Sequence, residues 1–225
     1  MGKRGPKPGF NLKRRISEKW SSNLAYAIGL LATDGCLSPP FSLVDLTSND
    51  REQLENFCKC LGVDFRITKK HGSSGKECLR VQFKNVIFYN FLLSIGLTPK
   101  KSRTLGPLKV PDRFFFDFLR GVFDGDGCTH SYWDPRWKSS FMFYLIFASA
   151  SPAFINWLRE KIRSKTGVSG HTTGPTSKNP CLQLKYAKRE SLVVLRKMYA
   201  GTNPMFLSRK HLKITKMLAI VGEQL

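Results

Sequence analysis

Gly-Leu-Leu-Ala-Thr-Asp-Gly at residues 29–35 and Gly-Val-Phe-Asp-Gly-Asp-Gly at residues 121–127 are two copies of one pattern. In each copy four residues separate a glycine from an Asp-Gly pair, and the two aspartates, Asp34 and Asp126, lie 92 positions apart. A single Asp-Gly is a common turn dipeptide. Two copies, each closing an apolar run, indicate instead that the chain is duplicated and carries two equivalent helix ends, each with one carboxylate.

The apolar runs at 24–32 and 114–123 are typical of helices rather than strands. Small residues spaced four apart, such as Gly29 with Thr33, allow two helices to pack backbone against backbone. We expect the two helices to lie side by side, so that their carboxyl ends bring Asp34 and Asp126 together. Gly35 and Gly127 are then expected to end the helices in the left-handed conformation.

The charge of the chain indicates its class of partner. Of the 225 residues, 37 are Lys or Arg and 16 are Asp or Glu, which gives a net charge of +21. The basic residues are spread along the whole sequence, and a folded surface with this excess attracts a polyanion, nucleic acid above all. A merely basic soluble protein or a ribosomal component is the alternative.

The cysteines and the apolar runs bear on the cellular compartment. The six cysteines form no Cys-x-x-Cys pair and have no histidine at zinc-finger spacing, so we expect free thiols in a reducing, intracellular compartment. No apolar run is long enough for a membrane span, and the basic N-terminus lacks the apolar stretch of a secretory signal.

The order of predicted elements repeats along the chain. Residues 1–19 are a basic arm rich in Gly and Pro, residues 20–108 form a first repeat, and residues 109–225 form a second. The first repeat is expected to contain helices at about 21–34, 50–61 and 86–95, an alternating segment at 41–47, and a hairpin of strands 64–70 and 78–84 around a Gly/Ser turn at 72–75. Asp50 is the expected N-cap of its helix and Gly62 the stop.

The second repeat follows the same order. Helices are expected at 112–126, 152–165, 189–199 and 208–221, and strands near 130–138, 141–149 and 181–187, with a Gly/Pro-rich turn at 170–180. Ser151 and Pro152 are the expected cap and first residue of the helix at 152–165. The extra residues of this repeat fall at 131–140. The prediction is an α+β pseudo-dimer.

Two carboxylates at helix C-termini are electrostatically unfavourable unless a cation binds them. Each faces the negative end of a helix dipole, at a cost of roughly 0.3–1 kcal/mol, and the two repel one another. A divalent cation that prefers oxygen ligands, Mg²⁺ first, offsets both effects. Asp124 lies two residues before Asp126, about 200° around the helix, and is expected to point into the protein.

Residues 24–35 and 118–127 resemble the paired LAGLIDADG motifs of homing endonucleases, and the likeness extends over about residues 20–225, including Gly-Leu-Thr-Pro-Lys-Lys-Ser at 96–102. The resemblance implies an αββαββα fold in each half, two four-stranded antiparallel sheets that form a saddle over DNA, and packing through the two motif helices. It also implies Mg²⁺-dependent cleavage of both strands with 3′ overhangs. Asp34 and Asp126 match the catalytic, metal-binding acids, with Gly35 and Gly127 beside them.

Further site residues follow from the same resemblance. Lys101 and Lys210 match the lysines that the family places near the scissile phosphates. A solvent-ordering polar residue falls at Ser48 in the first repeat and at Ala150 in the second, so the two half-sites are expected to differ. Ala32 stands where the family often has an acid, a change that spares Asp34.

Strand alternation predicts the residues that face DNA. A ten-residue strand spans about 33 Å, close to one turn of duplex, so two sheets cover about 20 base pairs. Arg and Gln pair with base edges and Lys with phosphates. The predicted contacts are Arg66, Thr68, Lys70, Arg80, Gln82 and Lys84 in the first repeat, and Gln183, Lys185, Arg136 and Lys138 in the second. Trp133 and Trp137 are expected to anchor their loop.

The sequence therefore predicts a monomeric, site-specific double-strand DNA endonuclease with an asymmetric target. Two alternatives stay open on the same scaffold: a maturase that binds intron RNA, and a DNA-binding regulator that does not cleave. The presence of both aspartates argues against the regulator but not against the maturase.

Overall fold

The structure, a computed structural model, describes residues 16–71, 77–175 and 181–225. Most of the predicted arm, the turn at 72–75 and part of the turn at 170–180 lie outside these ranges. The first half contains α1 (Ser22–Asp34), β1 (Gly35–Ser38), β2 (Leu43–Ser48), α2 (Arg51–Leu61), β3 (Ile67–His71), β4 (Glu77–Lys84) and α3 (Val86–Ser94). The second contains α4 (Phe115–Asp126), β5 (Cys128–Trp133), β6 (Phe141–Ser149), α5 (Pro152–Thr166), β7 (His171–Thr173), β8 (Leu182–Ala187), α6 (Lys188–Met198) and α7 (Ser208–Ile220). Short 3₁₀ turns cover Pro39–Phe41, Lys101–Arg103 and Asp112–Phe114.

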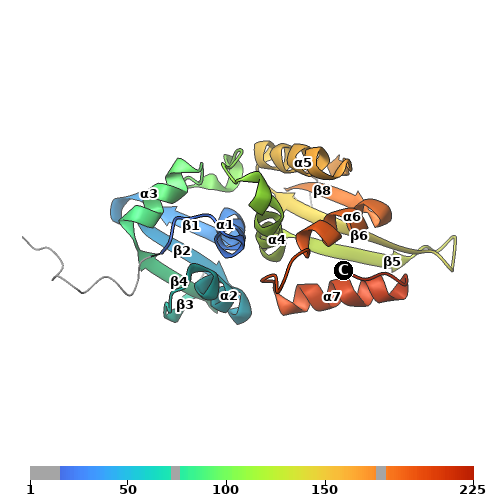
Figure 1. Cartoon of the computed structure of the whole chain (residues 1–225), viewed down its shortest axis with the longest axis horizontal. Coiled ribbons are helices and arrows are strands. Elements are labelled where there is room, and N and C mark those ends of the chain that lie inside the picture. Colours follow the sequence, from blue (N-terminus) through green and yellow to red (C-terminus); the bar gives the residue numbers. More distant parts are fainter. Residues whose placement is uncertain (1–15, 72–76, 176–180) are drawn as a thin grey trace, which may run out of the picture.

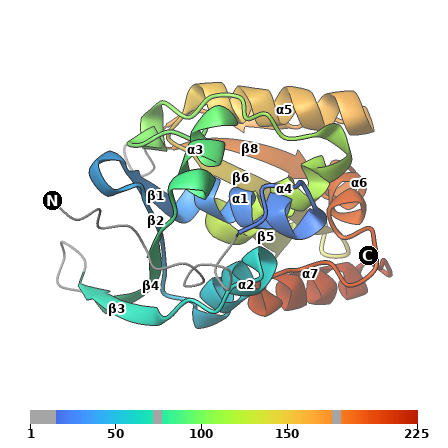
Figure 2. The same ribbon diagram turned by 60° about the vertical axis from the view of Figure 1, so that its left-hand side comes forward.

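The strands form two four-stranded antiparallel sheets of matching topology, β1-β2-β4-β3 and β5-β6-β8-β7. The predicted α+β fold with two αββαββα repeats is thereby confirmed. In Figure 1, α1 and α4 lie next to each other in the middle of the molecule, with one sheet on either side. Figure 2 shows the same arrangement from a second direction, with α2 close to α7.

Glycine allows α1 and α4 to approach so closely. A β-carbon on Gly29 would lie 2.8 Å from the Cα of Gly121, and one on Gly121 would lie 3.0 Å from the Cα of Gly29. Neither backbone has room for a side chain, so the two glycines mark the point where the helices cross. Around this contact Tyr26 and Phe118 are fully buried, and the core continues from the helix pair into both sheets.

Several local predictions are confirmed by the caps. Ser151 caps α5 by accepting a hydrogen bond from the Phe154 amide at 3.4 Å, with Pro152 in the first turn. Gly62 ends α2 in the left-handed conformation, with φ of 65°. Asp50 stands at the N-cap position of α2 but makes no capping bond, because its carboxylate accepts from Arg209 Nε at 2.7 Å instead.

The prediction that Gly35 and Gly127 adopt the left-handed conformation is wrong. Both are extended, with φ of −81° and −82°, because each helix passes directly into a strand. Glycine is needed here for space: a β-carbon on Gly35 would lie 2.5 Å from the Leu31 carbonyl oxygen, and one on Gly127 would lie 2.7 Å from the Phe123 carbonyl oxygen.

Three strands also differ from the prediction. β7 (His171–Thr173) lies in the segment 170–180 that is predicted as a turn, and it pairs with β8. β1 was not predicted as a separate strand, because four residues followed by two prolines carry no alternation. β5 starts at Cys128 and stops at Trp133, and residues 134–140 form a turn closed by a hydrogen bond from the Asp134 amide to the Ser140 carbonyl at 2.9 Å. Among the described residues, no helix is both long and apolar enough to cross a membrane.

Candidate active site

The two signature aspartates are the last residues of the two central helices, α1 and α4. The last turns of these helices touch: a β-carbon on Gly125 would lie 2.7 Å from the Cβ of Thr33 and 3.1 Å from Asp34 Oδ2. Asp34 is half-buried and Asp126 is exposed. The helix crossing at Gly29 and Gly121 therefore brings the carboxylates to one place, as the duplicated pattern predicted.

The proton affinity of both carboxylates is raised in the folded protein. Burial, and then the negative charge of Asp126, raise the pKa of Asp34 to about 6, against the lowering effect of a hydrogen bond from Gln53. Although the Asp126 side chain reaches the surface, the protein atoms packed around its carboxylate raise its pKa, and the ammonium groups of Lys210 and Lys101 oppose this rise. Both carboxylates are thus poorly solvated in their ionised form, and a bound cation would favour that form.

Both predicted lysines lie at these helix ends, each held by backbone carbonyls. Lys101 Nζ donates to the carbonyl oxygens of Thr33 and Gly35 at 3.2 and 2.6 Å. Lys210 Nζ donates to the carbonyls of Phe123, Gly125 and Gly127 at 2.7, 3.0 and 2.7 Å. These carbonyls belong to the last turns of α1 and α4 and to the glycines that follow, at the negative ends of the helix dipoles, where a cation is favourable.

The burial of the two ammonium groups changes their proton affinity. Burial lowers the pKa of Lys101, and it lowers the pKa of Lys210 to about 8, while neighbouring carboxylates act in the opposite direction. Both lysines are therefore close to the acids and more readily deprotonated than lysines in water.

Gln53 is a site residue that the sequence did not reveal. It lies in the first turn of α2, is buried, and donates from Nε2 to Asp34 Oδ2 at 2.7 Å. Ser48, the predicted solvent-ordering residue, lies behind it and donates to Gln53 Oε1 at 3.0 Å. A glutamine at the third residue of a helix reads as an ordinary first-turn residue, so only the tertiary contact identifies it.

The predicted equivalence of Ser48 with Ala150 is wrong. Ser48 ends β2 and accepts from the amide of Asp50, and Ser149 ends β6 and accepts from the amide of Ser151 in the same way. The two half-sites still differ, but five residues further along, at Gln53 and Phe154. The position of Gln53 in α2 is occupied in α5 by Phe154, which cannot donate to a carboxylate.

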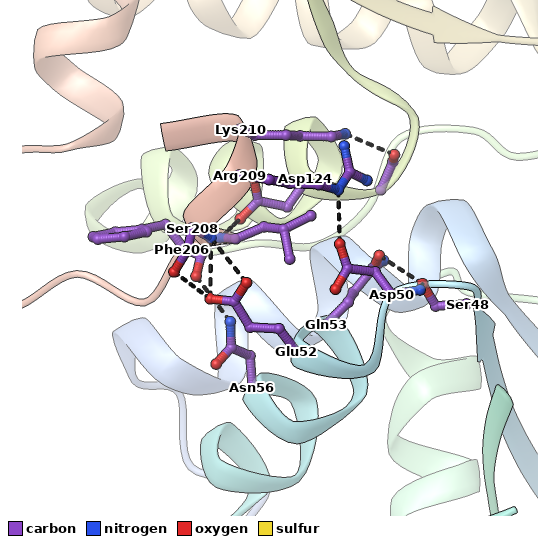
Figure 3. Close-up of polar contacts among 12 residues, drawn as sticks. Ser48, Asp50, Glu52, Gln53, Asn56, Asp124, Phe206, Ser208, Arg209 and Lys210 are labelled. Atoms are coloured by element: carbon purple, nitrogen blue, oxygen red, sulfur yellow. Dashed lines mark hydrogen bonds and ion pairs between the residues drawn. The ribbon is translucent and has the colours of Figure 1, made fainter. Parts of the chain in front are cut away.

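Asp124 points into the protein, as predicted from its angle on the helix. It is fully buried, and its Oδ2 accepts from Tyr26 Oη and from the Leu207 amide, both at 2.8 Å. Burial raises its pKa to about 6. Asp124 therefore ties α4 to α1 and to the start of α7 rather than joining the carboxylate pair (Figure 3).

The donor atoms at the two helix ends fit a hard divalent cation. No cluster of three or more His, Cys, Asp or Glu side chains exists within the ranges that the structure describes, so the side-chain ligands would be two carboxylates. Mg²⁺ is commonly held in this way, by one or two carboxylates together with waters and substrate phosphates. The carbonyls of Gly35 and Gly127 already accept from the lysines.

A groove of about 540 Å³ opens beside Asp34. It joins the carboxylate to the end of the first sheet and to the N-terminal end of α2. Its lining is polar: Asp34, Thr47, Ser48, Asn49, Asp50, Arg51, Gln53, Cys78, Gly125 and Arg209. A groove of this character fits a hydrated, charged ligand better than an apolar one.

The predicted DNA contacts of the first repeat share one face of the first sheet. Thr68 of β3 pairs with Arg80 of β4. Val81 and Phe83, which alternate with Arg80, Gln82 and Lys84 along β4, are buried on the opposite face, toward the helices. Lys70, Gln82 and Lys84 follow by alternation, and Arg66 lies exposed just before β3. This face is polar and strongly basic.

Asp45 is an acidic member of this face that the sequence did not reveal. It is nearly buried because three neighbours cover it: Gln82 Nε2 at 3.1 Å, Arg80 at 3.5 Å and Lys70 at 3.6 Å. Asp45 therefore fixes the directions of three of the predicted contact residues.

The equivalent face of the second sheet has a different character. Lys185 pairs with Ile146 and Gln183 with Ala148, so the two predicted residues lie on this face. Their neighbours are rings that the prediction missed: His130, Tyr132, Tyr144 and His171, with ring centroids 5.6 to 6.5 Å apart from one to the next. The face is aromatic and apolar with little charge.

The remaining predicted contacts lie in the β5–β6 turn. Arg136 is highly exposed and pairs with Asp134 at 3.0 Å, and Lys138 is exposed. Trp133 packs on Phe141, with ring centroids 5.1 Å apart. Trp137 is 69% exposed, so the prediction that it anchors the loop is wrong.

No protein-family model and no curated relative matches this sequence. Solved structures do match. The homing endonuclease I-WcaI bound to its DNA recognition sequence is 13% identical, with a TM-score of 0.57 over 94% of this chain and 95% of that one. I-DmoI in complex with DNA and Mn is 15% identical, with a TM-score of 0.51 over 81% and 98%.

A third match is full-length DUF199/WhiA from Thermatoga maritima. It is 13% identical, with a TM-score of 0.55 over 92% of this chain and 63% of that one, so this chain spans less than two thirds of that protein. At such identities the similarity shows the fold. The chain therefore has the LAGLIDADG fold, with both repeats in one polypeptide, as the sequence resemblance predicted.

Proposed function

We propose that this protein is a site-specific endonuclease that cleaves both strands of a long DNA target. One observation carries the proposal: two carboxylates with raised pKa, Asp34 and Asp126, end neighbouring helices between two sheets, and each helix end also holds a lysine, buried Lys101 at one and half-buried Lys210 at the other. A protein that only bound DNA would have no need for two carboxylates with raised pKa at the centre of its binding surface.

In this proposal Asp34 and Asp126 hold divalent cations, Mg²⁺ in the cell. The metal supplies charge for the phosphate oxygens and lowers the pKa of water. Gln53 orients Asp34 through the 2.7 Å hydrogen bond, and Ser48 fixes the glutamine. Lys101 and Lys210 keep the helix ends in place and bring positive charge to the scissile phosphates.

The two sheets are the proposed DNA-binding surface. Their uncovered faces carry Arg66, Thr68, Lys70, Arg80, Gln82 and Lys84 in one repeat and Gln183 and Lys185 in the other, with Arg136 and Lys138 in the adjoining turn. I-WcaI and I-DmoI, which share the fold, are bound to DNA in their structures. A duplex of about 20 base pairs spans two such sheets. The differing faces favour an asymmetric target, and one chain supplies both halves, so the protein acts as a monomer.

The test is to incubate the protein with a randomised duplex library and Mg²⁺, and to sequence the cut ends. We expect one long site cleaved on both strands, with 3′ overhangs. Asp34→Asn and Asp126→Asn are expected to bind the recovered site but not to cleave it. Asp112→Asn, an exposed residue paired with Lys161, is the matched control that should cleave normally.

Tight binding without cleavage would overturn the nuclease proposal and leave a DNA-binding protein. Preferential binding of structured intron RNA over every duplex would favour the maturase. Normal cleavage by Asp126→Asn would show that the site is assigned wrongly.

A further inference from the structure

Helix α7 carries Lys210 in its first turn, yet its own sequence supplies no cap. Its N-cap position is Leu207, which has no side-chain acceptor for the free amides of the first turn. The acceptors come from two other helices. Asp124 of α4 accepts from the Leu207 amide at 2.8 Å, and Glu52 of α2 accepts from the Ser208 amide at 3.0 and 3.2 Å and from the Ser208 hydroxyl (Figure 3).

Helix α2, which belongs to the first repeat, holds this segment at two more points. Asn56 Nδ2 donates to the Phe206 carbonyl at 2.8 Å, and Asp50 pairs with Arg209 at 2.7 Å. We call this set of contacts the α2–α7 seam; it consists of Asp50, Glu52 and Asn56 on one side and residues 206–209 on the other. The residue that follows the seam directly is Lys210.

The lysine of the first repeat is held differently. Lys101 lies in a 3₁₀ turn whose N-cap, Lys100, makes no side-chain capping bond. The carbonyl of Lys101 accepts from the amides of Thr104 and Leu105 at 3.0 and 2.8 Å, so hydrogen bonds within the same segment close the turn. Within the described residues no carboxylate accepts from a backbone amide of this turn. Among the described residues, a carboxylate of the other repeat therefore binds a backbone amide beside Lys210 but not beside Lys101; near the Lys101 turn the contact between repeats is the Ser151 hydroxyl, which donates to the Leu105 carbonyl at 2.5 Å.

We propose that Glu52 is a positioning residue for the second cleavage centre, that of Asp126 and Lys210. A carboxylate from the first repeat caps the helix that carries the second repeat's lysine, and negative charge at a helix N-terminus is favourable. Cleavage of one DNA strand thus depends on the α2–α7 seam, and cleavage of the other does not. The inference rests on the proposed nuclease function.

The matched control is on the same helix. Glu55 lies one turn after Glu52 and pairs with exposed Arg51 at 2.8 Å, away from α7. Glu52→Ala, Glu52→Gln and Glu55→Ala are compared on the recovered target, labelled on either strand, in single-turnover cleavage with Mg²⁺. Small displacements of a charged group from its working position cost up to about a hundredfold in rate.

We expect Glu52→Ala to slow the cleavage of one strand about tenfold, so that nicked duplex accumulates, while the other strand and the DNA affinity stay within about twofold. Glu52→Gln keeps a hydrogen-bond acceptor, so its cleavage rate on the affected strand should lie between those of Glu52→Ala and the unchanged protein. Glu55→Ala should cleave both strands at the rates of the unchanged protein. Equal slowing of both strands, or no slowing of either, would overturn the proposal.

A second measurement needs neither metal nor DNA. Hydrogen exchange of the amides at 207–210 is expected to become faster in Glu52→Ala and to stay unchanged in Glu55→Ala. Unchanged exchange at these amides, or faster exchange spread through the whole chain, would overturn the positioning role. If the unchanged protein cleaves no DNA, the nuclease proposal fails, and the exchange result still decides whether Glu52 fixes α7.

Discussion

Replacing Asp34 by Asn is expected to make the protein more stable near neutral pH while it removes cleavage. The carboxylate of Asp34 is half-buried, lies at a helix C-terminus and is repelled by the negative charge of Asp126. Its ionised form is therefore energetically unfavourable in the folded protein. Asparagine has the same shape, has no charge and keeps an oxygen that can accept the hydrogen bond from Gln53.

The size and sign of the effect follow from the pKa. The pKa of Asp34 in the folded protein, about 6, lies above its usual value of 3.8. The folded state therefore binds this proton more tightly than the unfolded state, and the stability that the proton contributes is complete below pH 3.8 and lost as the pH rises through 6. A difference of this size corresponds to at most about 3 kcal/mol. Because Asp34 is partly solvated, we expect Asp34→Asn to gain about 1–2 kcal/mol at pH 7.5.

The assay is urea unfolding of both proteins in EDTA, at pH 7.5 and at pH 4. Most of the gain should disappear at pH 4, where Asp34 is protonated in the folded protein. Mg²⁺ at pH 7.5 should stabilise the unchanged protein more than Asp34→Asn, because it relieves the same repulsion. Asp45→Asn is the control: Asp45 is covered by Arg80 and Gln82, so loss of its charge should give no gain.

Equal stability of the two proteins at pH 7.5 would refute the electrostatic reasoning. So would a gain of the same size at both pH values, which would come from packing rather than charge.

Three further predictions follow from the helix pair and the two sheets. Gly29→Ala should lower the free energy of unfolding by more than about 3 kcal/mol in thermal or urea melts, because the new methyl meets the α4 backbone, whereas Gly106→Ala, which meets nothing, should be neutral. Lys84→Ala should reduce the slope of log affinity against log salt by about 1 without changing the preferred sequence; an altered sequence preference would instead make Lys84 a base contact. Replacing thymidine by deoxyuridine removes the thymine methyl group, which apolar side chains contact. This replacement should weaken binding more in the half-site that faces Tyr144 and its neighbouring rings than in the half-site that faces Arg80. Equal losses of affinity in both half-sites would contradict the assigned difference between the sheets.

Features set by local sequence were predicted well. The α5 cap at Ser151, the α2 stop at Gly62 and the alternation of β4 each depend on a few neighbouring residues. The inward direction of Asp124 follows from helix geometry alone. One local prediction failed: Gly35 is predicted to be left-handed, but it is extended and makes room beside Leu31, because α1 passes directly into β1.

The correspondence between the repeats also needed the structure. The family resemblance places the solvent-ordering residue at Ser48 and Ala150, but strand ends and hydrogen bonds pair Ser48 with Ser149. The repeats differ in loop length, so the offset between equivalent residues changes along the chain. The sequence does not identify Gln53 and Glu52 as site residues for a related reason. Neither residue lies in a local sequence pattern that indicates which distant residue it will contact.

The sequence by itself determined the duplication, the two helix ends with their aspartates, the αββαββα order and the basic charge, because periodicity, caps and composition are local properties. Only the tertiary structure decided what surrounds those aspartates: Gln53 on Asp34, the lysines on the helix carbonyls, the rings on the second sheet and the carboxylate of Glu52 at the start of α7. The contacts of Gln53 and of Glu52 join residues 19 and 156 positions apart. They exist because the close crossing of α1 and α4 at Gly29 and Gly121 fixes how the two repeats meet.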